Sequence, residues 1–337
     1  MNNTDSKYTQ FSLCREMLET PDVIKNFNPD AAAGLAELVK DTGRVMLTGE
    51  GSSRIFPAKR VRTEMLRTSG KVIPHTEGST QALEYDLSDW GVLGASNSGR
   101  TRELIRLFKK LKESGHRKLG GVTVFDNSPL TAAVDKKLIL SCKEEKAVAA
   151  TKSVAEQAMV WQAVFAILNG RSFPDTAEGA QRVKEALNTS VPEEFIKPLI
   201  NARTIYFAGR NDGVAEEITL KTNEIVRKPS DFLEGTYAAH GIEEIMVQND
   251  VVILMDPFEI EEKKFKECLS DGVGNTVIAI STRDTLFPTL KVPAEGNWKE
   301  YVLLAAGWNI LVETGIASGI NLDKTERARK VGNEVEE

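Results

Sequence analysis

The sequence predicts an α/β protein made of two tandem, doubly wound parallel sheets of the flavodoxin type. Short apolar runs alternate with segments of helical periodicity, which is typical of parallel sheets whose two faces are both covered. This order occurs twice, and Val45–Gly49 in the first half resembles Ile205–Gly209 in the second, which indicates duplication of one module. A length of 337 residues also suits two domains of about 150 residues each.

The first half is expected to begin with two amphipathic helices, at about 9–19 and 30–42. A strand at 44–48 follows and ends in the turn 49–53. The further strands are expected at 71–74, 91–95, 119–125 and 137–140, with helices that end at 67 or span 102–114, 128–134 and 151–169.

The second half repeats this pattern, with strands at 203–207, 251–255 and 276–280 and helices at 214–227, 259–269 and 298–317. Gly, Ser, Pro and Asp cluster at 170–176 and mark a boundary between the halves. The expected organisation is therefore an N-terminal helical segment 1–29, a first domain 30–172, a second domain 173–325 and a C-terminal tail 326–337.

A Ser-x-Ser-Gly-x-Thr turn directly follows the expected strand 91–95. It places the hydroxyls of Ser96, Ser98 and Thr101 where a helix begins, and free N–H groups and the helix dipole both favour an anion there. The same turn could instead be only a helix N-cap. A second serine pair, Ser52–Ser53, follows the first strand and favours phosphate binding. Asn97 lies within the same turn.

The corresponding turns of the second half differ in charge. They carry Arg210-Asn211-Asp212 and Asp256-Pro257-Phe258, and their acidic residues are expected to repel phosphate. The sequence therefore predicts one phosphate site per chain, in the first half.

Composition excludes several classes of function. A net charge of −6 argues against dependence on nucleic acid or an anionic membrane surface. The apolar stretch 301–312 is too short to span a bilayer, and the N-terminus has no export signal. Three scattered cysteines and three histidines form no disulfide or metal-ligand pattern. We expect a cytoplasmic protein without metal, nicotinamide or flavin cofactor.

Five separated motifs together resemble the sugar isomerase (SIS) family, particularly the isomerase half of glucosamine-6-phosphate synthase and its stand-alone deaminase and deglycase relatives. The resemblance covers about residues 30–337. The motifs are Gly49–Ser53, Ser96–Thr101, Ala149–Lys152, the set Glu217, Lys221, Glu224 and His240-Gly241, and the tail Ala328–Val331.

The resemblance implies a role for each matching residue. The sugar phosphate would be held by Ser52, Ser53, Ser96, Asn97, Ser98 and Thr101, and the sugar by Glu50, Gly51, Ala150 and Thr151. Glu224 would move the proton between C1 and C2, beside Lys221. His240 would open the sugar ring of a neighbouring subunit, which implies a homodimer. Lys330 would close over the site, and it or Lys221 could condense with the open-chain carbonyl.

Each of these roles has a chemical reason. Isomerisation needs a free carbonyl, and an imidazole that titrates near neutrality suits ring opening. A carboxylate suits the proton transfer if partial burial lifts its pKa. Glu217, Lys221 and Glu224 have the spacing of one helix face, although surface ion pairs have the same spacing.

Departures from the family pattern leave the substrate open. Glu50 stands where a cysteine is usual, Asn97 where a glutamine is frequent, and Arg100 where an acidic residue is common. We expect aldose–ketose isomerisation of a hexose 6-phosphate derivative, coupled to deamination or deglycation. No cysteine-nucleophile domain for glutamine hydrolysis is expected. The alternative is a non-catalytic phosphosugar-binding regulatory protein, which would need the serine turns but not Glu224, His240 and Lys330.

Overall fold

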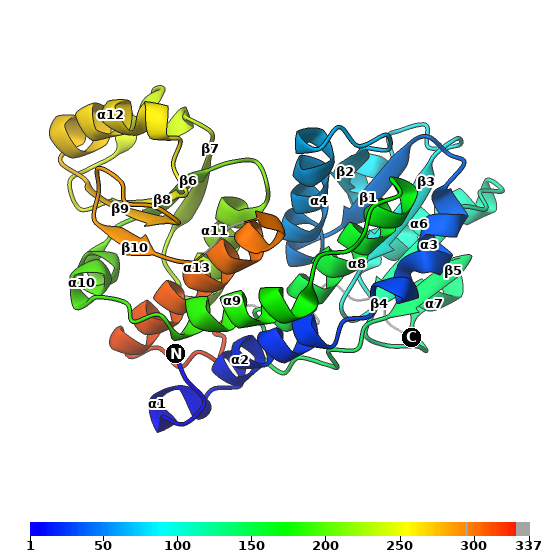
Figure 1. Ribbon diagram of the computed structural model, residues 1–337, viewed down its shortest axis with the longest axis horizontal. Helices are drawn as coiled ribbons and strands as arrows, with labels where there is room; N and C mark the ends of the chain where they lie inside the picture. The colour runs from blue at the N-terminus through cyan, green and yellow to red at the C-terminus, as the bar shows by residue number, and fades with distance from the viewer. Residues whose placement is uncertain (294–295, 328–337) are drawn as a thin grey trace. The chain divides into compact units, whose positions relative to one another are not determined.

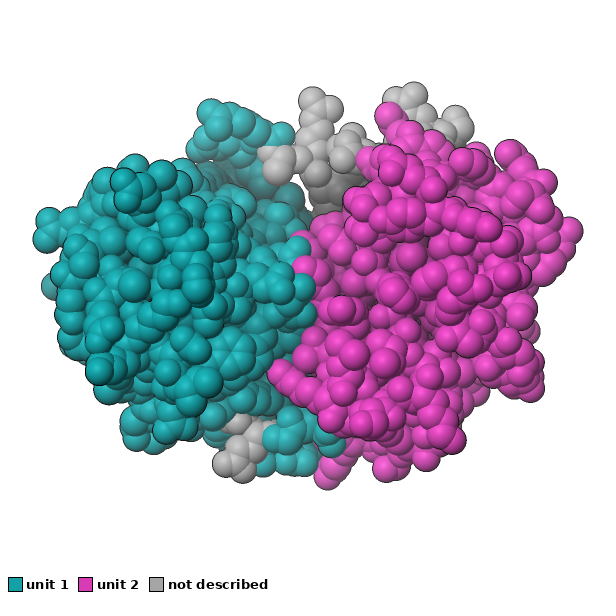
Figure 2. All heavy atoms as spheres, turned by 90° about the horizontal axis from the view of Figure 1, so that it is seen from above, with its two compact units in different colours: residues 1–21, 146–149, 177–328 teal, residues 22–145, 150–176, 329–337 magenta. Residues whose placement is uncertain are grey.

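The structure, a computed structural model, describes residues 1–293 and 296–327. These residues divide into two compact units (Figure 2). Unit 1 comprises residues 1–21, 146–149 and 177–327 without 294–295, and unit 2 comprises residues 22–145 and 150–176. In the described residues, no helix combines the length and hydropathy that a membrane span requires.

Unit 2 contains a five-stranded, wholly parallel sheet in the order β2-β1-β3-β4-β5 (Figure 1). The strands are β1 Val45–Gly49, β2 Pro74–Gly78, β3 Gly91–Ala95, β4 Leu119–Thr123 and β5 Lys136–Ile139. Every residue of β1, β3 and β4 is buried, as expected for strands covered on both faces. This is the flavodoxin order, so β1 and β3 flank the point where the winding reverses.

Helices cover both faces of this sheet. A Cβ on Gly94 would lie 2.7 Å from Leu104 of α6, whereas a Cβ on Gly120 would lie 2.8 Å from Leu35 of α3. Gly94 and Gly120 point to opposite faces, since Gly120 pairs with Leu93. One face carries α3 (Ala33–Val39), α4 (Ile55–Arg67) and α8 (Lys152–Leu168); the other carries α5 (Ser79–Ala82), α6 (Arg102–Glu113) and α7 (Pro129–Ala133).

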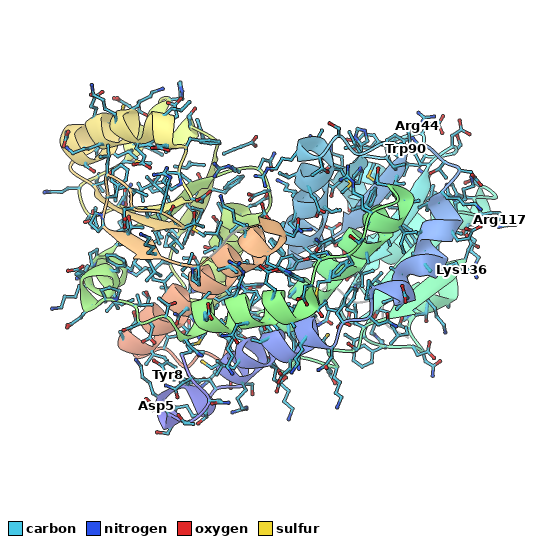
Figure 3. All side chains as sticks on the ribbon, in the orientation of Figure 1. Asp5, Tyr8, Arg44, Trp90, Arg117 and Lys136 are labelled. Carbon is cyan, nitrogen blue, oxygen red and sulfur yellow. The ribbon has the colours of Figure 1, made fainter. Side chains whose placement is uncertain are left out.

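At the amino ends of these strands, Arg44 and Trp90 stack on each other. Arg44 precedes β1 and Trp90 precedes β3 (Figure 3). The Arg44 guanidinium lies 5.4 Å from the Trp90 ring centroid, and a cation is attracted to an aromatic face at this distance. The carboxyl ends of the same strands, at the opposite edge, carry the polar turns.

Unit 1 contains a second five-stranded parallel sheet, in the order β10-β9-β8-β6-β7. Its strands are β6 Ile205–Gly209, β7 Ser230–Glu234, β8 Val251–Met255, β9 Thr276–Ser281 and β10 Thr289–Lys291. Read from β7, this order has the same topology as the sheet of unit 2. In both sheets the first and third strands in chain order are neighbours.

Two groups of helices pack on the sheet of unit 1. On one side α11 (Val214–Ile225), α13 (Lys299–Ala317) and α10 (Glu193–Asn201) pack together, and a Cβ on Gly307 of α13 would lie 2.5 Å from Ile218 of α11. Phe265 and Leu269, from α12 (Glu262–Phe265) and the π-helix η6 (Lys266–Val273), pack with sheet residues such as Tyr206 and Val252. The unit also contains α9 (Thr176–Asn188).

The N-terminal segment of unit 1 is held by α13 and the chain after it. It contains α1 (Ser6–Thr9) and most of α2 (Ser12–Lys25). Tyr8, labelled in Figure 3, donates to Glu313 Oε1 at 2.5 Å, and Lys7 lies 2.6 Å from Glu313 Oε2. The backbone N–H groups of Ser12 and Leu13 donate to Asp323. The expected segment 1–29 is thus divided between the two units.

Several expected elements are corrected by the structure. The strand expected at 71–74 begins only at Pro74, because the N–H groups of Lys71 and Val72 donate to the Asn169 side chain. The edge strands β7 and β10 were missed, since β7 is mostly polar and β10 has only three residues. The single helix expected at 259–269 is a 3₁₀ turn, α12 and the π-helix η6 in succession, and helices α9 and α10 were not anticipated.

Candidate functional site

The two serine turns of unit 2 lie at the carboxyl ends of β1 and β3. The turn Glu50–Arg54 follows β1, and Ser96–Thr101 follows β3. These adjacent strands flank the reversal of winding, where open α/β sheets bind their ligands. A Cβ on Gly49 would lie 2.8 Å from the Ala95 carbonyl oxygen, so the ends of the two strands approach closely.

The Ser96–Thr101 turn is held in shape by its own hydroxyls. Ser96 Oγ is buried, lies 2.7 Å from Thr101 Oγ1 and accepts a hydrogen bond from the N–H of Gly99. Gly99 has φ +66°, and a Cβ there would lie 2.3 Å from Ser128 Oγ. Only glycine suits this position, because the conformation is left-handed and the space is already filled.

This turn is more than a helix cap. Thr101 precedes α6, but its side chain makes no capping hydrogen bond. Within the described residues, no atom accepts a hydrogen bond from the N–H groups of Asn97, Ser98 or Thr101. The buried Asn97 Oδ1 has no partner there either. These unsatisfied donors at the start of a 12-residue helix form an arrangement that can bind an anion.

The turn after β1 offers one further hydroxyl. Ser53 is half-buried, and its hydroxyl has no partner among residues 1–293 and 296–327. Gly51 has φ +51°. Glu50 Oε1 accepts a hydrogen bond from the N–H of Ser79 at 2.8 Å, at the first residue of α5. One carboxylate oxygen of Glu50 is therefore engaged within the protein.

A buried carboxylate organises the segment expected to meet the sugar. Glu145 is fully buried and accepts hydrogen bonds from the backbone N–H of Thr151 at 2.7 Å, from the Thr151 hydroxyl at 2.8 Å and from Ser153 Oγ. The Thr151 hydroxyl therefore donates its hydrogen bond within the protein, to Glu145. The neighbouring Ala150 is half-buried. Glu145 was not singled out from the sequence, because a lone glutamate in a loop gives no signal.

In unit 1, a carboxylate–lysine–carboxylate cluster lies on α11. Lys221 Nζ is 3.3 Å from Glu217 Oε1 and 2.8 Å from Glu224 Oε2. Glu217 and Lys221 are fully buried, whereas the Glu224 side chain is 24% exposed. The predicted shared helix face is confirmed, and Glu224 is the member of the cluster that solvent reaches.

The charge state of Lys221 follows from these neighbours. Burial lowers its pKa, but the carboxylates of Glu224 and Glu217 raise it more, so the net shift is upward. Lys221 therefore remains an ammonium ion at neutral pH. It can orient Glu224, but it cannot add to a carbonyl without first losing a strongly held proton, which disfavours the condensation considered for it.

His240 lies apart from this cluster in sequence, in the loop between two 3₁₀ turns. It is exposed, and its Nε2 lies 2.9 Å from Lys264 Nζ of α12. An ammonium can donate to Nε2 only if that nitrogen is unprotonated. Gly241 follows with φ +107°. Lys330 and the rest of the motif 328–331 lie outside the described residues.

The corresponding turns of unit 1 contain an internal ion pair, where the sequence suggested bare negative charge. Asp256 is paired with Arg210 and Lys299, so its carboxylate is neutralised by two cations. Asp212 is buried and accepts from the N–H of Val214 at the start of α11. We expected acidic residues to repel phosphate from these turns. This explanation is wrong for Asp256, because its charge is balanced by Arg210 and Lys299.

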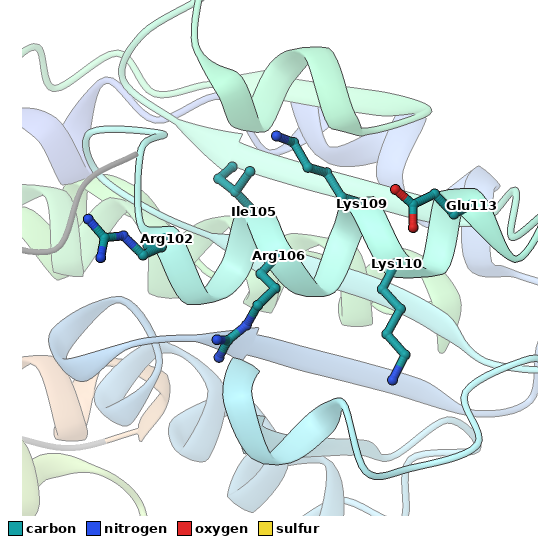
Figure 4. A pocket seen from close by; sticks show the side chains of 6 residues that line it. All are labelled: Arg102, Ile105, Arg106, Lys109, Lys110 and Glu113. Carbon is teal, nitrogen blue, oxygen red and sulfur yellow. The ribbon is translucent and has the colours of Figure 1, made fainter. Parts of the chain in front are cut away.

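A basic pocket runs along the outer face of α6 in unit 2 (Figure 4). It is lined by Arg102, Ile105, Arg106, Lys109, Lys110 and Glu113. Arg106 donates to Thr80 Oγ1 and Lys110 to the Leu83 carbonyl. Neither forms an ion pair with a carboxylate of residues 1–293 or 296–327. The pocket contains none of the predicted phosphate-binding residues, but it lies on the helix that follows their turn.

Two of the three cysteines are poor candidates for catalysis. Cys14 and Cys142 are buried, and burial raises the pKa of Cys14 to about 12 and that of Cys142 further. A thiol is nucleophilic only as the thiolate. In the described residues, no three His, Cys, Asp or Glu side chains gather as a metal site would require.

The fold matches solved structures of phosphosugar enzymes. The C-terminal domain of glucosamine-fructose-6-phosphate aminotransferase from Francisella tularensis matches with a TM-score of 0.77 and 18% identity, over 95% of this chain and 100% of that one. Glucosamine-6-phosphate deaminase from Thermotoga maritima matches at 0.76 and 22%, over 96% and 99%. Tagatose-6-phosphate ketose/aldose isomerase from Escherichia coli matches at 0.77 and 16%, over 96% and 98%.

These matches confirm the resemblance to the sugar isomerases at the level of the fold. Almost the whole of this chain and almost the whole of each relative superpose. No protein-family model matches the sequence, and no characterised protein sequence matches it either.

Proposed function

We propose that the chain is a phosphosugar-processing enzyme that holds a hexose 6-phosphate derivative by its phosphate at the Ser96–Thr101 turn. The observation that carries the proposal is the uncapped start of α6, where the N–H groups of Asn97, Ser98 and Thr101 lack acceptors among the described residues. A dianionic phosphate would satisfy these donors and interact favourably with the helix dipole. The hydroxyls of Ser53 and Ser98 would complete the cradle.

The proposed chemistry is aldose–ketose isomerisation, coupled to deamination or deglycation. Glu224 would carry the proton between C1 and C2, because it is the partly exposed carboxylate of its cluster. Lys221 would fix its orientation as an ammonium ion. His240 would open the ring in the site of a partner subunit of a homodimer, and Lys330 would close over the sugar.

The proposed organisation is two tandem SIS domains, at 30–172 and 173–325, in a cytoplasmic protein. Two structural neighbours, a glucosamine-6-phosphate deaminase and a tagatose-6-phosphate ketose/aldose isomerase, support the substrate class. They do not choose between deaminase, deglycase and simple isomerase.

A non-catalytic phosphosugar-binding protein is the second candidate. It is favoured by one contact: His240 Nε2 lies 2.9 Å from Lys264 Nζ, so this nitrogen already has a partner within the protein. In such a protein the phosphate turn would act without Glu224 and His240.

The test is turnover of glucosamine 6-phosphate, fructose 6-phosphate and a fructosamine 6-phosphate by the wild type and by Glu224→Gln. We expect turnover of at least one substrate, and a loss of about 10²–10⁴-fold in Glu224→Gln with binding retained, the usual effect of removing a general acid–base group. Glu185→Gln, an exposed helical glutamate, is the matched control and should keep full activity. Tight binding of all three without turnover would contradict the enzyme and leave the binding protein.

A further inference from the structure

In the second sheet, the carboxyl ends of β6 and β8 form the kind of edge at which open α/β sheets bind ligands. These strands correspond to β1 and β3 of the first sheet, because both pairs flank the reversal of winding. Arg210 follows β6, Asp256 follows β8, Ser281 ends β9, and Lys299 begins α13. Nothing in the proposed function uses these four residues.

Their side chains converge on a single carboxylate. Arg210 Nη1 donates to Asp256 Oδ2 at 3.0 Å, Lys299 Nζ lies 2.5 Å from the same oxygen, and Ser281 Oγ donates to Oδ1 at 3.3 Å. The Asp256 side chain is only 7% exposed. Two cations and a hydroxyl directed at one small anion are a donor set that also suits a phosphoryl group.

Each donor also has a support other than the Asp256 carboxylate. Arg210 Nη1 donates to the backbone carbonyl of Asp256 as well. The Arg210 guanidinium lies 4.2 Å from the Phe258 ring centroid, which orients its planar fork by cation–π attraction. Ser281 belongs to a buried strand, and Lys299 extends from the first turn of a 19-residue helix.

The carboxylate occupies this position at a cost. Asp256 has φ +48°, in the left-handed region that costs a non-glycine residue on the order of 1 kcal/mol. Its N–H donates to the Ile280 carbonyl at 2.8 Å, so the strained backbone is anchored to the sheet. The strained residue is thus the one whose carboxylate contacts Arg210, Lys299 and Ser281.

We propose that this is an anion site occupied by the chain's own Asp256 carboxylate, and that a dianionic phosphoryl group is the ligand it takes when the carboxylate leaves. With Asp256 in place, the charges of Arg210, Lys299 and Asp256 sum to +1; without it, they sum to +2, which matches a dianion. A tetrahedral phosphoryl group also offers an oxygen to each of the three donors.

The test is equilibrium dialysis of the full chain against radiolabelled inorganic phosphate, comparing the wild type with Asp256→Gly. Glycine adopts φ +48° without strain. Arg210 and Lys299 are 26% and 32% exposed, so both can reach water when the carboxylate is removed. We expect Asp256→Gly to bind one more phosphate per chain than the wild type. The affinity of this site for phosphate should be at least about tenfold higher than in the wild type. The reason is that the Asp256 carboxylate is an intramolecular competitor with an effective concentration of millimolar or more.

Two further variants make the result decisive. Adding Arg210→Gln to Asp256→Gly should remove the extra phosphate. Asp284→Gly removes an exposed aspartate paired with Lys291, and it should behave as the wild type. An unchanged stoichiometry in Asp256→Gly, or an extra phosphate that persists without Arg210, would overturn the proposal.

If Asp256→Gly does not fold by circular dichroism, Asp256→Asn takes its place, since asparagine also tolerates the left-handed region. It should show the same extra phosphate with lower affinity, and stoichiometry equal to the wild type would again overturn the proposal. The count also separates this site from the one in unit 2. Zero phosphates in the wild type and one in Asp256→Gly would support the self-occupied site and contradict the Ser96–Thr101 cradle.

Discussion

The two sheets have the same strand topology, but they differ at the edge where open α/β sheets bind ligands. The difference is whether the polar groups of the turns there are already paired within the described chain. In unit 2 the turn after β3 leaves the N–H groups of Asn97, Ser98 and Thr101 without acceptors in the described chain. In unit 1 the turn after β8 carries Asp256, whose carboxylate already engages Arg210 and Lys299. The two turns, Ser96-Asn97-Ser98 and Asp256-Pro257-Phe258, therefore differ in whether their polar groups are already paired within the described chain.

The difference extends to the interior of α11. There Lys221 is buried between Glu217 and Glu224, so its charge is also balanced internally. At these two places unit 1 balances its buried charges internally, whereas the Ser96–Thr101 turn of unit 2 leaves N–H donors without acceptors in the described residues. The predictions below test each half of this contrast, from the largest expected effect to the smallest.

Removing the central cation of unit 1 should have the largest effect. Lys221→Met leaves two carboxylates close together without the ammonium between them, and breaking a buried pair in this way costs about 3–5 kcal/mol of unfolding free energy. The measurement is urea denaturation at pH 7. Lys197→Met, which breaks an exposed ion pair with Glu193, is the control and should change stability by less than about 1 kcal/mol.

The pH dependence of this effect has a definite sign. The pKa of Lys221 is raised in the folded chain, so its contribution to stability is fully present below the unfolded pKa near 10.5. It is lost only as the pH rises through the higher folded value. The difference between wild type and Lys221→Met should therefore be constant from pH 7 to about pH 10 and shrink above it. A difference that shrinks below pH 8 would contradict a buried ammonium.

Closing the open turn of unit 2 should have the next largest effect. Gly99→Ala places a Cβ against Ser128 at a positive φ, so the turn must move. A displacement of about 1 Å costs on the order of 100-fold at a positioned site, and we expect that loss in affinity for fructose 6-phosphate by isothermal titration calorimetry. Gly43→Ala also has a positive φ but open space around it; equal weakening in that control would count against the turn.

Removing one hydroxyl from the turn should have a smaller effect. Thr101→Val deletes the partner of Ser96 Oγ without changing the shape of the side chain. A hydrogen bond between two neutral groups is worth about 0.5–1.5 kcal/mol, so we expect affinity for fructose 6-phosphate to fall by up to about tenfold as the turn loosens, with affinity for unphosphorylated fructose unchanged. Thr42→Val, whose hydroxyl donates to the Val39 carbonyl, should bind as the wild type does.

Reversing charge on the outer face of α6 should have the smallest effect. Arg106→Glu with Lys110→Glu changes the field around the turn but none of its donors. We expect the association rate of a dianionic substrate to fall several-fold at low salt and to approach the wild-type value at high salt, because steering is screened. A salt-independent loss in stopped-flow experiments would show that these side chains contact the ligand directly.

The sequence predicts the parts of the fold that depend on local pattern. Buried strands such as 91–95 and helices such as 102–114 were found because apolar runs and helical periodicity are local. Edge strand β7 was not, since Ser230–Glu234 is mostly polar and becomes a strand only by pairing with β6. The shift of β2 likewise depends on Asn169, almost a hundred residues away.

The same division holds for the candidate site. The serine turns and the spacing of Glu217, Lys221 and Glu224 are visible in the chain, and the structure brings each group together. Two other interactions depend on where side chains point, which the sequence does not show. The Thr151 hydroxyl donates to Glu145, and Asp256 forms ion pairs with Arg210 and Lys299. Charge alone therefore predicted repulsion at a turn that is in fact neutralised.

The contrast between the two turns is tested most directly by amide chemical shifts. Fructose 6-phosphate is titrated into ¹⁵N-labelled protein, with unphosphorylated fructose as the comparison. We predict that the amide signals of Asn97, Ser98 and Thr101 move with fructose 6-phosphate alone, while those of Arg210 and Asp256 do not. Unmoved signals at Ser96–Thr101, or shifts confined to Arg210 and Asp256, would contradict the assignment of the open anion site to unit 2.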